Sequence, residues 1–301
     1  MFDELLKAAV EQLITGATGQ AARIVDDVSC GGGCINDART LLLADERKFF
    51  LKSNAAPLTE MFQREAEGLN ALADVEQIRV PRALGAGGGS NSNSGAIPHI
   101  VIEHIETGRP GPGFMEDFGR RFALLHRHSQ GTRFGSEHDN YIGATPQPNG
   151  WRESWADFWR EHRLGYQLQL ARQNGHCDSR MRRLGDRLME RLPELIGLNE
   201  PPCLLHGDLW SGNFLCASDD APVLIDPAAY YGQREADLAM TMLFGGFSPA
   251  FYEAYQEVWP LANGWWNRIE IYRLYHLMNH LNLFGVSYRN ECMDILQRYG
   301  G

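Results

Sequence analysis

One polar loop between short apolar segments constrains this 301-residue chain more than any other feature. The loop reads HGDLWSGN over residues 206–213, and it follows the apolar segment 203–205. A second apolar segment begins after Asn213, turns back on itself and ends at Asp226. Two short strands joined in this way form a hairpin. We therefore predict that the hairpin returns Asp226 to the side of Asn213, 13 residues earlier (226 − 213).

The polar side chains of this segment suit phosphoryl transfer. That reaction needs a carboxylate that accepts the proton of the acceptor hydroxyl, and it needs oxygen ligands for Mg²⁺. Asp208 is the candidate base, and Asn213 and Asp226 are the candidate metal ligands. His206 is predicted to brace the loop through hydrogen bonds. The alternative is a polar turn without a catalytic role, which the spacing and the strand context disfavour.

The first third of the chain holds a second candidate set. Lys52 ends the apolar segment 48–52, and Glu65 lies on the helix predicted for residues 58–73. Apolar residues recur every three or four positions on the same face as Glu65. An unpaired carboxylate on such a face is costly, so Lys52 is its predicted partner. In kinases a pair of this type orients ATP. The alternative is that Glu65 borders the face and reaches solvent.

A glycine-rich turn precedes these residues. Gly31, Gly32 and Gly33 leave room for backbone amides to approach the phosphates of ATP, although a plain turn has the same composition. Cys34 follows the glycines and Cys30 precedes them. A redox role for these thiols is one hypothesis, because an amide-lined loop can activate a thiol. Small loop residues without a role are the alternative.

The pattern of the chain changes near residue 107. Residues 1–106 are rich in predicted strands and residues 107–301 are mostly helical, so we predict an α+β fold in two lobes. A cluster of glycines and prolines at 107–113 marks the boundary. Glu103 and Ile105 come just before this cluster. Their order along the chain predicts backbone hydrogen bonds to the adenine edge of ATP.

Charged residues at two predicted helix ends have more than one interpretation. Glu235 and Asp237 begin a helix, where they either complement the helix dipole or support the loop at 206–213. His126 and His128 end another helix, and we expect them to be charges that cap its C-terminus.

Composition and charge exclude several classes of protein. The formal net charge of −10 argues against nucleic acid and anionic membrane surfaces as partners. No apolar run is long enough to span a bilayer, and the first residues lack the features of a signal peptide. The six cysteines lack the spacing of a zinc site. We therefore expect a cytoplasmic protein with reduced thiols, and the sequence predicts no oligomeric state.

These residues resemble the fructosamine/ketosamine-3-kinases, a branch of the protein-kinase-like fold related to the aminoglycoside phosphotransferases. The loop HGDLWSGN is similar to that family's catalytic loop, and its Trp210-Ser211 pair is more typical of this branch than of the antibiotic kinases. Lys52 and Glu65 match the family's Lys and Glu elements. Similar segments extend over nearly the whole chain and include 139–143, 146–147, 225–228, 230–232, 234–240 and 279–285.

The resemblance implies a small, strand-rich N-lobe that binds ATP and a larger, helical C-lobe with the catalytic loop and the substrate site. It implies ATP- and Mg²⁺-dependent phosphorylation of the 3-hydroxyl of a fructosamine, ribulosamine or related ketosamine on a glycated amine or protein. Such phosphorylation destabilises the adduct and promotes its release, which is deglycation. By this likeness Asp208 is the base, Asn213 and Asp226 hold the metal, and Lys52 with Glu65 orients ATP.

Two alternatives stay open at this point. One alternative to a ketosamine kinase is a kinase for another small hydroxylated substrate, such as an aminoglycoside. The other is a kinase-like fold that binds a ligand without catalysis. The intact set of candidate catalytic and metal-binding residues argues against the second.

Overall fold

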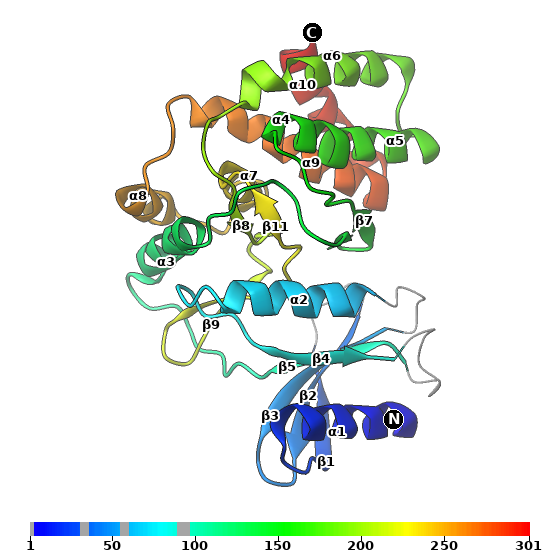
Figure 1. The fold of residues 1–301 in the computed structure, drawn as a ribbon, viewed down its shortest axis with the longest axis vertical. Coiled ribbons are helices and arrows are strands. Elements are labelled where there is room, and N and C mark those ends of the chain that lie inside the picture. The colour runs from blue at the N-terminus through cyan, green and yellow to red at the C-terminus, as the bar shows by residue number, and fades with distance from the viewer. Residues whose placement is uncertain (1–2, 31–35, 55–59, 89–96) are drawn as a thin grey trace. The chain divides into compact units, whose positions relative to one another are not determined.

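The computed structural model describes residues 3–30, 36–54, 60–88 and 97–301 (Figure 1). Its contacts divide the chain into two compact units. The first unit comprises residues 1–111 with 215–226, and the second comprises 112–214 with 227–301. The predicted lobe boundary after residue 106 stays a prediction.

The first unit is built on a five-stranded antiparallel sheet in the order β1-β2-β3-β5-β4. Its strands are β1 (Ile24–Ser29), β2 (Asp37–Leu43), β3 (Lys48–Ser53), β4 (Ala83–Gly87) and β5 (His99–Glu103). Two helices, α1 (Glu4–Thr18) and α2 (Met61–Ala73), complete it. Apolar side chains of α1 and the sheet, among them Ile14, Leu51 and Val101, are fully buried in one core. The predicted helix at 58–73 is thus present as α2.

A hairpin from the middle of the chain also belongs to the first unit. Strands β9 (Phe214–Cys216) and β10 (Pro222–Leu224) pair with each other, as the sequence predicts. Ala217 and Val223 pack against Ile105 in a small separate core. The chain leaves this hairpin at Asp226, so the first unit contains Asp226 together with the residues of the sheet.

The second unit is mainly helical, with short strands between its helices. Its longer helices are α3 (Phe114–His128), α5 (Gly165–Gln173), α6 (Ser179–Ile196), α8 (Pro249–Val258), α9 (Trp265–Phe284) and α10 (Arg289–Gly300). Shorter elements are α4 (Trp155–Phe158), a π-helical segment (Trp159–Leu164), α7 (Glu235–Thr241) and a 3₁₀ turn (Val286–Tyr288). Buried residues occur on all sides of α9, which makes it the central helix of this unit.

Two small antiparallel sheets position the polar loops of the second unit. Strand β8 (Cys203–Leu205) pairs with β11 (Tyr230–Gly232), and β6 (Asn140–Ile142) pairs with β7 (Thr145–Gln147). The loop at 206–213 therefore leaves the end of β8 beside the segment that enters β11. None of the helices in the described part of the chain is both long and apolar enough to cross a bilayer. A strand-rich first unit and a helix-rich second unit confirm the predicted α+β class.

Candidate active site

Three charged side chains meet in the first unit. Lys52, on β3, is 7% exposed, and its Nζ donates to Glu65 Oε1 at 2.7 Å. The same ammonium donates to Asp226 Oδ1. The predicted ion pair of Lys52 with Glu65 is therefore present, and Asp226 is a second anionic partner that the sequence did not predict. Asp226 has a left-handed backbone with φ of 55°, which is uncommon for a residue with a side chain.

The charges of this cluster shift each other's protonation. Burial opposes the charge on Lys52, but the carboxylates of Glu65 and Asp226 outweigh burial and raise the pKa of Lys52 above its usual value. Burial raises the pKa of Glu65, the charge of Lys52 opposes that shift, and Asp226 adds to it. One ammonium thus serves two carboxylates, so the cluster has room for further positive charge near Asp226, whose side chain is 44% exposed.

In the second unit, Asp237 holds the start of the predicted catalytic loop. Its carboxylate accepts the backbone N–H of His206 at 2.7 Å and that of Gly207 at 2.8 Å. Asp237 is 1% exposed and lies in α7. Burial opposes its charge, but the hydrogen bonds of His126 and Gly207 outweigh burial and lower the pKa of Asp237. Of the two interpretations of this acid, support of the loop is confirmed.

The histidine behind Asp237 corrects one expectation from the sequence. His126 is fully buried, with Nε2 at 3.2 Å from Asp237 Oδ2 and Nδ1 at 2.8 Å from Tyr255 Oη. Burial lowers the pKa of His126, although the hydrogen bond to Asp237 opposes that shift. The prediction of a capping charge was wrong for His126, which is a neutral spacer between Asp237 and Tyr255.

The loop at 206–213, which is the predicted catalytic loop, is closed by short-range hydrogen bonds. Asp208 N–H donates to His206 Nδ1 at 3.3 Å, so His206 braces the loop as predicted. Asn213 is 6% exposed, and its Nδ2 donates to the Asp208 carbonyl at 2.8 Å and to Asp208 Oδ2 at 3.3 Å. Gly207 has φ of 82°, and a Cβ there would lie 2.1 Å from the Ala228 oxygen. Only glycine fits at this position.

The remaining predicted ATP contacts are the glycine turn and the segment before the lobe boundary. The glycine turn, Gly31 to Gly33, and Cys34 lie outside the described residues. Glu103 N–H donates to the Arg82 carbonyl at 2.8 Å, so an adenine contact at Glu103 would use its carbonyl. Ile105 is 8% exposed in the small core next to β10. The position of Asp226 relative to Asn213 stays a prediction.

Known proteins resemble this chain over nearly its whole length. The sequence model of the fructosamine kinase family matches residues 6–300. The chain belongs to the fructosamine kinase family. It is 43% identical over 295 residues to a probable ketoamine kinase of Synechocystis sp., with 96% of this chain and 95% of that protein covered. It is 41% identical to a chloroplastic protein-ribulosamine 3-kinase of Arabidopsis thaliana, with 93% and 84% covered.

Solved structures agree with the family. A fructosamine-3-kinase candidate from Thermobifida fusca superposes with a TM-score of 0.84 at 34% identity, with 96% of this chain and 97% of that chain covered. An aminoglycoside phosphotransferase in complex with ADP and hygromycin B has a TM-score of 0.65 at 15% identity, with 97% and 99% covered, which shows a shared fold. The kinase-like fold is therefore confirmed, and this fructosamine kinase family member is a phosphotransferase.

An aromatic surface of this family member adjoins the catalytic loop. Trp210, within the loop, is 39% exposed, and the centroid of its ring lies 6.5 Å from that of Phe244. The ring centroid of His280, on α9, lies 4.9 Å from that of Phe244 and 5.4 Å from that of Phe284. Exposed rings of this kind can pack against the apolar face of a sugar. The family resemblance covers Trp210 and the segment 279–285, which contains His280, whereas Phe244 lies in none of the resembling segments.

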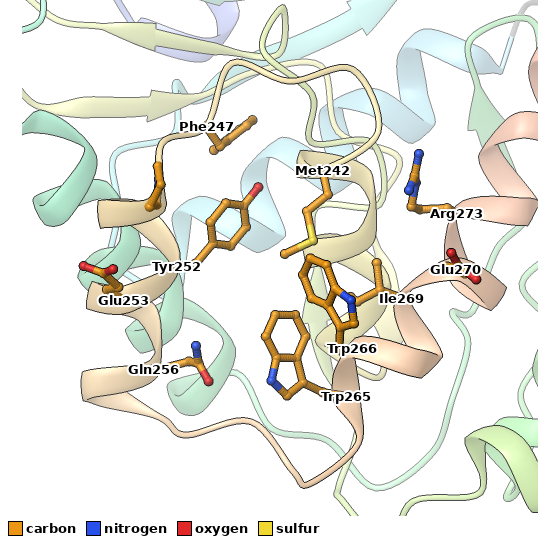
Figure 2. A pocket seen from close by; sticks show the side chains of 11 residues that line it. Met242, Phe247, Tyr252, Glu253, Gln256, Trp265, Trp266, Ile269, Glu270 and Arg273 are labelled. Atoms are coloured by element: carbon orange, nitrogen blue, oxygen red, sulfur yellow. The ribbon is translucent and has the colours of Figure 1, made fainter.

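A pocket of about 430 Å³ lies among α8, α9 and the loop that joins α7 to α8 (Figure 2). Figure 2 shows the rings of Trp265 and Trp266 on one side and Tyr252 on the other. None of the predicted site residues in the described part of the chain lines it. Its wall residue Phe247 follows Gly246, where an added Cβ would lie 2.4 Å from Ser211 in the catalytic loop. The pocket thus adjoins the loop without containing the predicted chemistry.

Proposed function

We propose that the chain is an ATP- and Mg²⁺-dependent ketosamine 3-kinase that phosphorylates the 3-hydroxyl of a fructosamine or ribulosamine on a glycated amine or protein. The observation that carries the proposal is the geometry of the loop at 206–213. Asp237 binds the backbone at its start, and Asp208 lies beside Asn213 within it. The names of the relatives, ketoamine kinase and ribulosamine 3-kinase, support this class of acceptor. The likeness to aminoglycoside phosphotransferases rests on the fold alone, at 15% identity.

Asp208 is the general base of this proposal. It accepts the proton of the acceptor hydroxyl while the hydroxyl oxygen bonds to the γ-phosphorus of ATP and the bond to the bridging oxygen breaks, which releases ADP. The bond from Asn213 Nδ2 to Asp208 Oδ2 orients the carboxylate. Asp237 fixes the backbone on the N-terminal side of Asp208 through His206 and Gly207. The base is therefore positioned before the acceptor arrives.

The residues present fit a magnesium ion. Asn213 uses its amide nitrogen toward Asp208, which leaves its oxygen for a hard cation, and Asp226 binds Lys52 through only one of its oxygens. No cluster of three or more His, Cys, Asp or Glu side chains suited to a metal occurs among the described residues. Mg²⁺ commonly takes one or two protein ligands and completes its shell with phosphates and water. When bound, the ion neutralises charge on the phosphates.

Lys52 orients ATP in this proposal. Its ammonium, held by Glu65, contacts the phosphates, as in other kinases. Backbone groups of Glu103 and Ile105 are the proposed adenine contacts, and the glycine turn at Gly31, Gly32 and Gly33 is the proposed phosphate cover. Phosphorylation of the sugar destabilises the adduct, so the proposed role of the enzyme is deglycation.

The test is a panel of acceptors with Mg²⁺ and ATP. Fructosyl-lysine, ribulosyl-lysine, kanamycin and a blank without acceptor are compared by ADP release and product mass. We expect one added phosphate on a ketosamine, and loss of turnover in Asp208→Asn. Asp186→Asn, an exposed carboxylate on α6 in the same unit, is the matched control and should retain turnover. Phosphorylation of kanamycin alone, or full activity in Asp208→Asn, would overturn the proposal.

A further inference from the structure

A buried network of polar side chains ends on two backbone carbonyls of the second unit. Gln147 Nε2 donates to the Ala228 carbonyl at 3.1 Å, and Asn140 Nδ2 donates to the Ala229 carbonyl at 2.9 Å. Both side chains come from the β6–β7 hairpin, where Gln147 is 1% exposed and Asn140 is 9% exposed. Buried carbonyls need such donors, so the simplest explanation is that the network only satisfies them.

The two amides that bind those carbonyls are themselves held by further side chains, and Gln147 Nε2 also donates to Asn140 Oδ1 at 2.8 Å. The Arg163 guanidinium, which can only donate, binds Asn149 Oδ1 at 2.8 Å, and Asn149 Nδ2 donates to Asn140 Oδ1 at 2.8 Å. From α9, the Tyr275 hydroxyl donates to Gln147 Oε1 at 2.6 Å. Gln147 and Asn140 therefore each have a single favoured amide orientation, with the nitrogen toward the carbonyls of Ala228 and Ala229. The direction of the network is set at its outer ends.

The inner end of the network lies against the catalytic loop. Ala228 N–H donates to the His206 carbonyl at 2.9 Å, and the Ala228 oxygen lies in the space that a Cβ on Gly207 would fill. Asp208 comes two residues after His206, and Asp226 comes two residues before Ala228 (208 − 206; 228 − 226). The backbone that leads to the proposed base and the backbone that leads from the proposed metal ligand are thus both tied to one residue.

We infer that Gln147 is a positioning residue for phosphoryl transfer and that Tyr275 fixes its orientation. The inference rests on the proposed kinase function. Without the bond from Gln147, the Ala228 carbonyl loses its side-chain donor, so the peptide between Ala228 and Ala229 is less restrained and the two neighbouring segments shift with it. In-line transfer is sensitive to displacements of about 1 Å, so the effect falls on kcat more than on the KM of the acceptor.

The chain offers a matched control for this arrangement. Tyr272, also on α9, donates to Gln233 Oε1 at 3.0 Å, and Gln233 Nε2 donates to the Leu198 carbonyl at 3.3 Å. Gln233 is 1% exposed, like Gln147, but the carbonyl it binds belongs to a segment without a predicted role. Replacing either glutamine removes the same chemistry from an equally buried position. Only one of the two replacements acts on the catalytic loop.

The experiment compares Gln147→Met with Gln233→Met, and Tyr275→Phe with Tyr272→Phe. We expect both Met variants to lower Tm. Only Gln147→Met should lower kcat, by about tenfold or more, with the acceptor KM within about twofold of wild type. It should also raise the Mg²⁺ concentration that gives half-maximal rate. Tyr275→Phe, the milder change, should show the same pattern at smaller amplitude, and Tyr272→Phe should not.

A second readout does not depend on turnover. Amide hydrogen exchange in peptides that cover 204–209 and 227–231 should accelerate in Gln147→Met and stay at the wild-type rate in Gln233→Met. Equal kcat losses in the two Met variants, or unchanged exchange in Gln147→Met, would give Gln147 a purely structural role and overturn the inference. If wild type phosphorylated no acceptor, the proposed function would fail, and hydrogen exchange would still decide whether Gln147 holds the loop.

Discussion

The two units hold their central carboxylates by different means. In the first unit, charge is balanced by charge, because the Lys52 ammonium binds both Glu65 and Asp226. In the second unit, Asp237 is balanced by backbone N–H groups and by the neutral ring of His126. An ammonium with two carboxylates keeps a partner when one is removed. Backbone amides cannot move to a new acceptor, so the second arrangement should be less tolerant of change.

Asp237→Asn should have the largest effect on stability, because an amide offers one acceptor oxygen where the carboxylate offers two. One of the N–H groups of His206 and Gly207 would then face an NH₂ group. We expect the free energy of unfolding to fall by about 3–5 kcal/mol, measured by urea denaturation, with a parallel loss of kcat. Asp186→Asn should stay within about 0.5 kcal/mol of wild type. Equal losses of unfolding free energy in Asp237→Asn and Asp186→Asn would contradict the view that the second unit depends on the carboxylate of Asp237.

Lys52→Met tests the charge-balanced cluster. It leaves two carboxylates without their ammonium, so we expect a stability loss of about 3 kcal/mol and a fall in kcat/KM for ATP of more than about 100-fold. Lys48→Met is the control, since Lys48 lies on the same strand with a 45% exposed side chain. In a Glu65→Gln background the stability cost of Lys52→Met should shrink, because only the half-exposed Asp226 then loses a partner. An undiminished cost would show that the two carboxylates do not share Lys52.

The loss of unfolding free energy at low pH should depend in part on His126 in the second unit. The pKa of His126 is lowered in the folded state, so below about pH 6.5 the unfolded chain binds a proton that the folded chain does not. Stability contributed by the neutral ring is therefore present at higher pH and falls as pH drops, by up to about 1.4 kcal/mol per pH unit.

His126→Gln should reduce the dependence of unfolding free energy on pH between about pH 7 and 5 by the share of one histidine. The rest of the slope should persist, because burial also lowers the pKa values of His99, His162, His276 and His280. His128→Gln, an exposed histidine on the same helix, should leave the slope as in wild type. A slope in His126→Gln that equals the wild-type slope would mean that His126 contributes nothing to it.

Local rules predicted part of this site. The pairing of Lys52 with Glu65 follows from helical periodicity and from the cost of an unpaired carboxylate on an apolar face. Helical periodicity also indicates that His126 is buried, because Phe118, Phe122 and His126 recur every four residues on the buried face of α3. Position at a helix end was the weaker guide, since burial of the face overrides it.

Long-range contacts could not be predicted in this way. Asp226 joins Lys52 only because the β9–β10 hairpin packs with the first unit, through side chains such as Val223 that carry no signal of their partner. Gln147 and Asn140 act on backbone carbonyls that lie 81 and 89 residues later in the chain, and a backbone acceptor has no residue type that a sequence pattern could show. The α+β class was accessible because it depends on the density of strands and helices, which is a local property.

Glu65→Gln should have the smallest effect and makes the sharpest test of the comparison. Lys52 then keeps Asp226, and the buried glutamine can still accept a hydrogen bond from the ammonium, so we expect a stability loss of about 1 kcal/mol. Asp226 should pair more fully with Lys52 and be less available to Mg²⁺, which predicts a higher Mg²⁺ concentration for half-maximal rate. Titration of activity with Mg²⁺ at saturating ATP measures this shift. If stability fell as far as in Asp237→Asn, a charge shared between two partners would tolerate change no better than one held by the backbone.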